Sequence, residues 1–189
     1  MINTKQERWN TVYENGVKFN QNSNSKILDT INSVHNKDLN ILDIGCGVGE
    51  LSIFLNKNGC NVVGADISNT AINKAEILNK ESNTNVKFIV GDIYDINEKF
   101  DAIICKLVYA FIEDKNIFLE KVKSILNKSG RFVISTPVIT EENKNNVLKP
   151  GICITEKDIE FLKNSFSEVN LTLDIKDNFG DNYIIECII

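Results

Sequence analysis

A glycine-rich turn and an acidic residue further along the chain are the residues best suited to chemistry. Gly45-Cys46-Gly47-Val48-Gly49-Glu50 directly follows a short apolar run. Glycines let the backbone turn tightly and let a ligand approach it, and the N–H groups that open a following helix attract an anionic group. Asp66 lies 21 residues after Gly45 and ends the next apolar run, where an open α/β sheet places the carboxylate that binds a ribose diol. The spacing predicts a site for a nucleoside-type cofactor.

The glycine spacing also bears on which cofactor is expected. A dinucleotide-binding turn has the pattern G-x-G-x-x-G, whose third glycine allows close packing of helix on strand. Glu50 stands where that third glycine should be. This departure weakens the alternative of an NAD(P)-dependent oxidoreductase on the same kind of sheet, and it leaves the nucleoside site itself intact.

The elements that must position these residues follow a β–α–β pattern. Short apolar runs alternate with amphipathic segments, which is typical of a parallel sheet covered by helices. The last two strands are joined by about six residues, too few for a crossover, so they form an antiparallel hairpin. The predicted fold is α/β, a doubly wound, mostly parallel seven-stranded sheet with a C-terminal antiparallel hairpin. The expected strands are 39–44, 61–65, 86–90, 101–105, 131–135, 169–175 and 183–189, and the expected helices are 6–14, 27–34, 50–57, one capped by Ser68 or Asn69, 114–126 and one starting at 155–158.

The chain of 189 residues is expected to form a single domain, 1–189. We divide it into an N-terminal helical cap (1–37), a cofactor-binding core (38–135) and a C-terminal part (136–189). That last part holds a substrate loop, a helix and the terminal hairpin. The stretch 136–154 is long for a loop, and loops of that length are usually functional. We expect the N-terminal helices, the segment 106–114 and this loop to build the acceptor pocket.

Composition argues against several classes of partner. The net charge is −5 and the 21 basic residues are scattered, which argues against nucleic acid. Five cysteines without a close pair fit reduced thiols, and a single histidine, His35, expected in a surface loop, leaves little for a metal site, so we expect no metal. The N-terminus has no secretory pattern and no apolar run is long enough for a membrane span. We therefore expect a cytoplasmic protein without a membrane partner; its oligomeric state is left unassigned.

Several motifs in a fixed order resemble those of class I S-adenosylmethionine-dependent methyltransferases of the small-molecule type. They are Leu42-Asp43-Ile44-Gly45-Cys46-Gly47-Val48-Gly49, Gly64-Ala65-Asp66-Ile67-Ser68, Gly91-Asp92-Ile93, Phe100-Asp101-Ala102-Ile103-Ile104-Cys105 and Leu126-Asn127-Lys128-Ser129-Gly130-Arg131-Phe132. The terminal hairpin is similar to the reversed last strand of that family. Glu7-Arg8-Trp9-Asn10-Thr11-Val12-Tyr13 also resembles the N-terminal helix of thiopurine- and tellurite-type methyltransferases.

The resemblance implies S-adenosyl-L-methionine as cofactor and a role for each matching residue. Asp43 and the glycine turn would hold the methionine end, and Asp66 the ribose hydroxyls. Asp92 would bond the adenine amino group between Ile67 and Ile93. The implied cofactor-binding residues are Trp9, Asp43, Gly45, Cys46, Gly47, Gly49, Asp66, Ile67, Asp92, Ile93, Cys105 and Lys106.

Some of these residues also have an ordinary structural explanation. Asp43 could cap the amides of the glycine turn, and Asp92 could be a turn residue. Trp9 and Tyr13, four residues apart, could be two core aromatics of one helix. A buried cysteine such as Cys105 usually acts as a small hydrophobe.

The implied reaction is in-line transfer of a methyl group to a small-molecule acceptor, with RNA or a protein side chain as the alternative acceptor. The paired histidines that many members carry after strand four are replaced by Ala110 and Phe111. No catalytic residue is therefore assigned, and the candidates are Tyr13, Lys106 and Tyr109. A lysine beside a cationic methyl donor is unfavourable unless it orients an anionic acceptor or points away.

Overall fold

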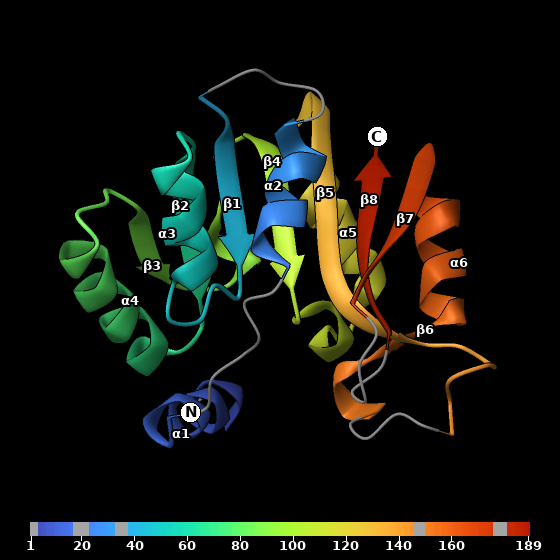
Figure 1. Ribbon diagram of the computed structural model, residues 1–189, viewed down its shortest axis with the longest axis horizontal. Helices are drawn as coiled ribbons and strands as arrows, with labels where there is room; N and C mark the ends of the chain where they lie inside the picture. The colour runs from blue at the N-terminus through green and yellow to red at the C-terminus, as the bar shows by residue number, and fades with distance from the viewer. Residues whose placement is uncertain (1–3, 17–22, 33–37, 146–149, 176–180) are drawn as a thin grey trace.

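The computed structural model describes residues 4–16, 23–32, 38–145, 150–175 and 181–189, in which a single mixed sheet forms the centre (Figure 1). Along the sheet the strand order is β3-β2-β1-β4-β5-β8-β7, and the short strand β6 pairs in parallel with the end of β5. The bounds are β1 Asn40–Ile44, β2 Asn61–Asp66, β3 Lys87–Val90, β4 Phe100–Lys106, β5 Leu126–Ile139, β6 Ile154–Thr155, β7 Glu168–Ile175 and β8 Asp181–Ile188.

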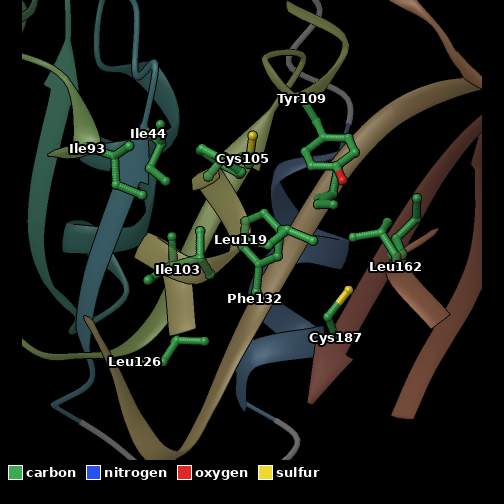
Figure 2. Packing of buried hydrophobic residues seen from close by; sticks show 14 of the residues in the cluster. Ile44, Ile93, Ile103, Cys105, Tyr109, Leu119, Leu126, Phe132, Leu162 and Cys187 are labelled. Atoms are coloured by element: carbon green, nitrogen blue, oxygen red, sulfur yellow. The ribbon is translucent and has the colours of Figure 1, made fainter. Parts of the chain in front are cut away.

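Helices cover both faces of the sheet, as a doubly wound fold requires. On one face α2, α3 and α4 pack against Ile41, Ile104 and their neighbours, and on the other α5 and α6 pack against Ile103, Phe132 and the residues that Figure 2 shows. Helix α1 lies beyond the carboxyl ends of β1 and β4 (Figure 1). The bounds are α1 Thr4–Glu14, α2 Asn24–Asn32, α3 Glu50–Lys57, α4 Asn69–Glu81, α5 Lys115–Ile125 and α6 Glu156–Ser165.

Local capping explains where these helices begin. The Ser68 hydroxyl accepts from the Ala71 amide at the start of α4, and the Asp114 carboxylate accepts from the Ile117 amide at the start of α5. Thr155 opens α6 in a capping box with Asp158. Each such cap satisfies amide groups that the first helical turn leaves unpaired and stabilises the helix by about 1 kcal/mol.

The path of seven strands and the antiparallel pairing of β7 with β8 confirm the predicted fold class. Three details of the prediction are wrong. The sheet gains an eighth strand, β6, and β5 begins at Leu126 instead of residue 131 because Leu126 already pairs with Phe100. Strand β5 also continues to Ile139, so the first residues of the expected loop 136–154 belong to the sheet. The end of the expected helix 27–34 and His35 lie outside the described residues.

Candidate cofactor site

A cavity of about 280 Å³ lies at the carboxyl ends of β1, β2 and β4, beneath α1. Strand β1 has β2 on one side and β4 on the other, so the strand order changes direction at this point. Open α/β sheets bind ligands in the crevice that such a reversal creates. The cavity is lined by Lys5, Trp9, Tyr13, Gly16, Asp43, Ile44, Gly45, Cys46, Gly47, Val48, Glu50, Leu51, Ala65, Asp66, Ile67, Lys74, Gly91, Asp92, Ile93, Lys106, Leu107, Val108, Phe111, Ile112 and Phe118.

The glycine turn is tied to the end of β2 by backbone hydrogen bonds. The amides of Gly45 and Cys46 both donate to the Ala65 carbonyl, at 2.7 and 3.0 Å. Gly47 has a φ of +55°, and an added Cβ there would lie 2.7 Å from the Tyr13 hydroxyl. This position therefore requires glycine both for its left-handed backbone and for the close approach of α1.

The Asp66 carboxylate lies buried at the end of β2 and is held in a fixed orientation. Its Oδ2 accepts from the Gly47 amide at 2.9 Å, and its Oδ1 accepts from the Ser68 amide at 2.8 Å. Burial raises its pKa, and these two hydrogen bonds act in the opposite direction. Each carboxylate oxygen can accept more than one hydrogen bond, so Asp66 can still accept from the two hydroxyls of a ribose.

Asp43 is a second buried acid on the cavity wall, with only 2% of its surface exposed. The Ser52 hydroxyl donates to Asp43 Oδ2 at 2.6 Å. Burial raises the pKa of Asp43 to about 6, although the Ser52 hydrogen bond and the charge of Lys106 lower it. Asp43 borders the cavity, but the amides of the glycine turn donate to other acceptors, Gly47 to Asp66 and both Gly45 and Cys46 to the Ala65 carbonyl. A role of Asp43 toward the cofactor stays a prediction.

Helix α1 forms the roof of the cavity through polar contacts with the β2–α4 segment. Gln6 Nε2 donates to the Ile67 carbonyl at 2.7 Å, and the Ser68 hydroxyl donates to Asn10 Oδ1, also at 2.7 Å. Lys74 Nζ donates to the Tyr13 carbonyl at 2.6 Å. These contacts place the Tyr13 ring in the cavity, where burial first and the charge of Asp66 second raise the pKa of its hydroxyl.

Trp9 closes the opposite side of this roof. Its ring meets Phe111 edge to face, with 5.2 Å between ring centroids, and lies 6.3 Å from the Tyr13 ring. Aromatic pairs in this arrangement contribute about 0.5–1.5 kcal/mol beyond the area they bury. Trp9 and Tyr13 therefore line the cavity and pack within one helix at the same time.

The residues expected around an adenine ring lie just after the carboxyl ends of β2 and β3. Ile67, Asp92 and Ile93 all line the cavity. Ile93 is buried, and Asp92 begins a short 3-10 helix in which Asp95 completes a capping box. Asp92 therefore has the turn role considered for it and also faces the cavity.

Three of the expected site residues do not line the cavity. Gly49 packs against Phe88 behind the glycine turn. Cys105 is fully buried with Ile103 on the face of the sheet that α5 covers, because neighbouring residues of a strand point to opposite faces. Tyr109 is also fully buried, with Phe118 and Phe132 around its ring. Figure 2 shows Tyr109 beside Phe132, and its hydroxyl has no hydrogen-bond partner among the described residues. A catalytic role of Tyr109 has no support in this placement.

The apolar part of the wall lies in the segment 106–114, one of the three segments expected to build the acceptor pocket. It comes from the segment after β4, chiefly Val108, Phe111 and Ile112. Leu107 has a φ of +58°, an uncommon conformation for a residue other than glycine. Its amide donates to the Ser135 carbonyl at 2.8 Å, which holds the turn in place. The described part of 136–154 contributes no lining residue.

The sheet order and the cavity above it define a class I methyltransferase. The family model described as "Methyltransferase domain" matches residues 35–176, well over half of the chain, and the chain belongs to this family. Its cofactor is S-adenosylmethionine. Membership sets aside the oxidoreductase alternative.

Individual relatives agree with this assignment. The ubiquinone biosynthesis O-methyltransferase of Chelativorans sp. (strain BNC1) is 36% identical over 101 residues, which are 52% of this chain and 40% of that protein. The chain thus spans about two fifths of the length of the first curated relatives.

Two solved structures share the fold. Magnesium protoporphyrin IX methyltransferase from Synechocystis PCC 6803, solved with S-adenosylmethionine, has a TM-score of 0.69 at 21% identity and covers 98% of this chain and 91% of its own. The 1,6-didemethyltoxoflavin-N1-methyltransferase of Burkholderia thailandensis has a TM-score of 0.72 at 16% identity, with coverages of 97% and 86%.

None of the described helices is long and apolar enough to cross a membrane. No group of three potential metal-ligating side chains occurs in the part of the chain that the structure describes.

Proposed function

We propose that this chain transfers a methyl group from S-adenosylmethionine to a small-molecule acceptor. The observation that carries the proposal is the cavity at the strand-order reversal, with the buried Asp66 carboxylate on one wall and the glycine turn beside it. These groups fit the cofactor, since a ribose needs hydrogen-bond acceptors and an amino-acid tail needs open backbone. The named relatives support a small acceptor, because their names describe the methylation of quinone precursors and of a toxoflavin precursor.

When bound, the cofactor supplies a methyl group on a positively charged sulfur, which is already a strong donor. The chain's own residues then have to bind, orient and exclude water. Asp66 and the glycine turn fix one end of the ligand, while Val108, Phe111 and Trp9 provide an apolar wall from which water is excluded. Holding two reactants in the productive geometry can lower a barrier by as much as about 7–11 kcal/mol.

A protein base is not part of the proposal. Tyr13 is the only one of the three candidates with a hydroxyl on the cavity, and burial raises its pKa, so it keeps its proton at neutral pH and acts as a hydrogen-bond donor. Ala110 and Phe111 occupy the positions of the histidines found in related enzymes. We infer an acceptor that is nucleophilic without assistance.

The test combines calorimetry with the fluorescence of Trp9, the single tryptophan, which lines the cavity. S-adenosylhomocysteine should bind the wild type and change its tryptophan emission saturably. Asp66→Asn should weaken that binding at least about 10-fold, because it loses charged hydrogen bonds. Asp29→Asn, on the exposed surface of α2, removes the same charge and should bind normally.

Two results would count against the proposal. Failure of the wild type to bind S-adenosylhomocysteine or S-adenosylmethionine would refute the proposed function. Binding by Asp66→Asn with wild-type affinity would remove Asp66 from the ribose site, because it would show that the carboxylate contributes nothing to binding.

A further inference from the structure

Lys106 is a cavity residue that the proposed function does not use. It is the last residue of β4 and points to the same face of the sheet as Ile104, toward α2 and α3. Its Nζ donates to Asn24 Oδ1 of α2 at 2.8 Å. Lys106 forms no ion pair with any residue that the structure describes, although five other ion pairs occur there.

This arrangement leaves N–H donors of the Lys106 ammonium group available to a ligand. A lysine has three N–H donors, and Asn24 is a neutral acceptor for one of them. Burial lowers the pKa of Lys106, while the charges of Asp43, Glu50 and Asp174 act in the opposite direction. Since Asn24 accepts only one of the three donors and Lys106 lines the cavity, the ammonium group can still donate to an anionic oxygen of a ligand there.

The charges around Lys106 match one part of the cofactor. Asp43 and Glu50 line the same cavity as Lys106, on the side of the glycine turn and the start of α3. Two acids and one ammonium group are complementary to an α-amino acid, which carries one positive and one negative group. The apolar residues Val108 and Phe111 also line this cavity and offer no charge to the amino-acid group.

We propose that Lys106 is the counter-ion of the α-carboxylate at the methionine end of the cofactor, with Asn24 holding the lysine in place. This inference rests on the proposed function. It explains how a lysine can stand near a cationic sulfur: the negative charge of the carboxylate offsets the repulsion between the two positive charges. An anionic group of the acceptor is the competing source of the same chemistry, and the test separates the two.

The test measures the affinities of two ligands that differ by one group. S-adenosylhomocysteine has the carboxylate, whereas its decarboxylated analogue keeps the adenosine, the sulfur and the amine. Lys106→Met should weaken S-adenosylhomocysteine about 10- to 100-fold, the range of a charged hydrogen bond, and should change the affinity of the analogue less than twofold. Lys106→Arg should recover part of the loss. Lys87→Met, an exposed lysine of β3 outside the cavity, is the control for loss of a positive charge.

The outcomes are distinct. Loss of both ligands to the same extent in Lys106→Met would overturn the inference, because it would show a general effect on the cavity. An unchanged affinity for S-adenosylhomocysteine would also overturn it, and would leave an acceptor anion as the partner of Lys106. If the wild type bound neither ligand, the proposed function would fail and this inference with it.

Discussion

Replacing Gly49 by alanine should destabilise the fold strongly, and the structure gives the size of the effect. Gly49 has a φ of +82°, and an added Cβ would lie 2.5 and 2.9 Å from two ring atoms of Phe88 and 3.0 Å from the Ala75 Cβ. The left-handed backbone costs an alanine about 1–2 kcal/mol. Crowding against a buried ring adds about 1–3 kcal/mol. We therefore expect the free energy of unfolding to fall by about 2–5 kcal/mol.

Gly59 provides the matched control for the contact with Phe88. Its φ is +91°, and an added Cβ would meet nothing within 4 Å. Gly59→Ala should thus lose only about 1–2 kcal/mol, the backbone part of the effect. Urea unfolding monitored by circular dichroism gives both values, provided that the two variants share the wild-type m-value.

The comparison has a clear refutation. Equal losses in Gly49→Ala and Gly59→Ala would show that the Phe88 ring moves aside without cost. Phe88→Leu in the Gly49→Ala background should recover part of the loss, because the two changes are coupled through one contact. Gly49 does not line the cavity, so the folded Gly49→Ala variant should bind S-adenosylhomocysteine within about threefold of the wild type.

Two further predictions concern buried polar groups. Tyr109→Phe removes a buried hydroxyl without a partner and should raise the unfolding free energy by about 1 kcal/mol, with unchanged methyl transfer; a lower transfer rate in a stable variant would restore Tyr109 as a catalytic candidate. For Asp43 the folded pKa is about 6 against a usual 3.8, so the folded state binds more protons and stability should fall as pH rises from about 4 to about 6. The full effect is about 3 kcal/mol at about 1.4 kcal/mol per pKa unit, and Asp43→Asn should lack this part of the fall between about pH 4 and about pH 6. Parallel stability profiles of the two proteins would contradict the assignment.

Much of the fold is predictable from local signals. Ser68, Asp114 and Thr155 each precede an amphipathic segment, and each begins a helix in the structure. The short link between 175 and 181 permits only an antiparallel pair, and β7 and β8 pair in that way. These features depend on interactions within a few residues, which a sequence displays directly.

The start of β5 depends on contacts far along the chain. Ser129 and Gly130 are a typical helix ending, but α5 ends at Ile125. Asn127 Nδ2 donates to Asp101 Oδ1 at 2.6 Å, and the β4–β5 pairing shifts register between Phe100 and Ala102. This irregular pairing places Gly130 within β5. The contact that Asn127 makes with Asp101 spans 26 residues of sequence, so no local signal predicts it.

The candidate site also has parts that local sequence signals predict and parts that they do not. The glycine turn and Asp66 were predictable because their spacing follows from one β–α–β unit. The apolar wall was predictable only as a segment, 106–114. The placement of Val108 and Phe111 within it follows a left-handed residue, Leu107, that no turn signal marks. Strand alternation could have corrected one expectation: Cys105 and Lys106 are neighbours in β4 and must point to opposite faces.

The roof of the cavity and Asp66, the acid proposed to bind the ribose, depend on one segment of the chain. Asp66 precedes Ile67 and Ser68, whose carbonyl and hydroxyl bond to Gln6 and Asn10 of α1. The Ser68 amide donates to Asp66 itself. A displacement of this segment would therefore move the acid and the roof together. The segment that positions the helix over the cavity thus also fixes the acid proposed to bind the ribose, so a change in this segment should affect both.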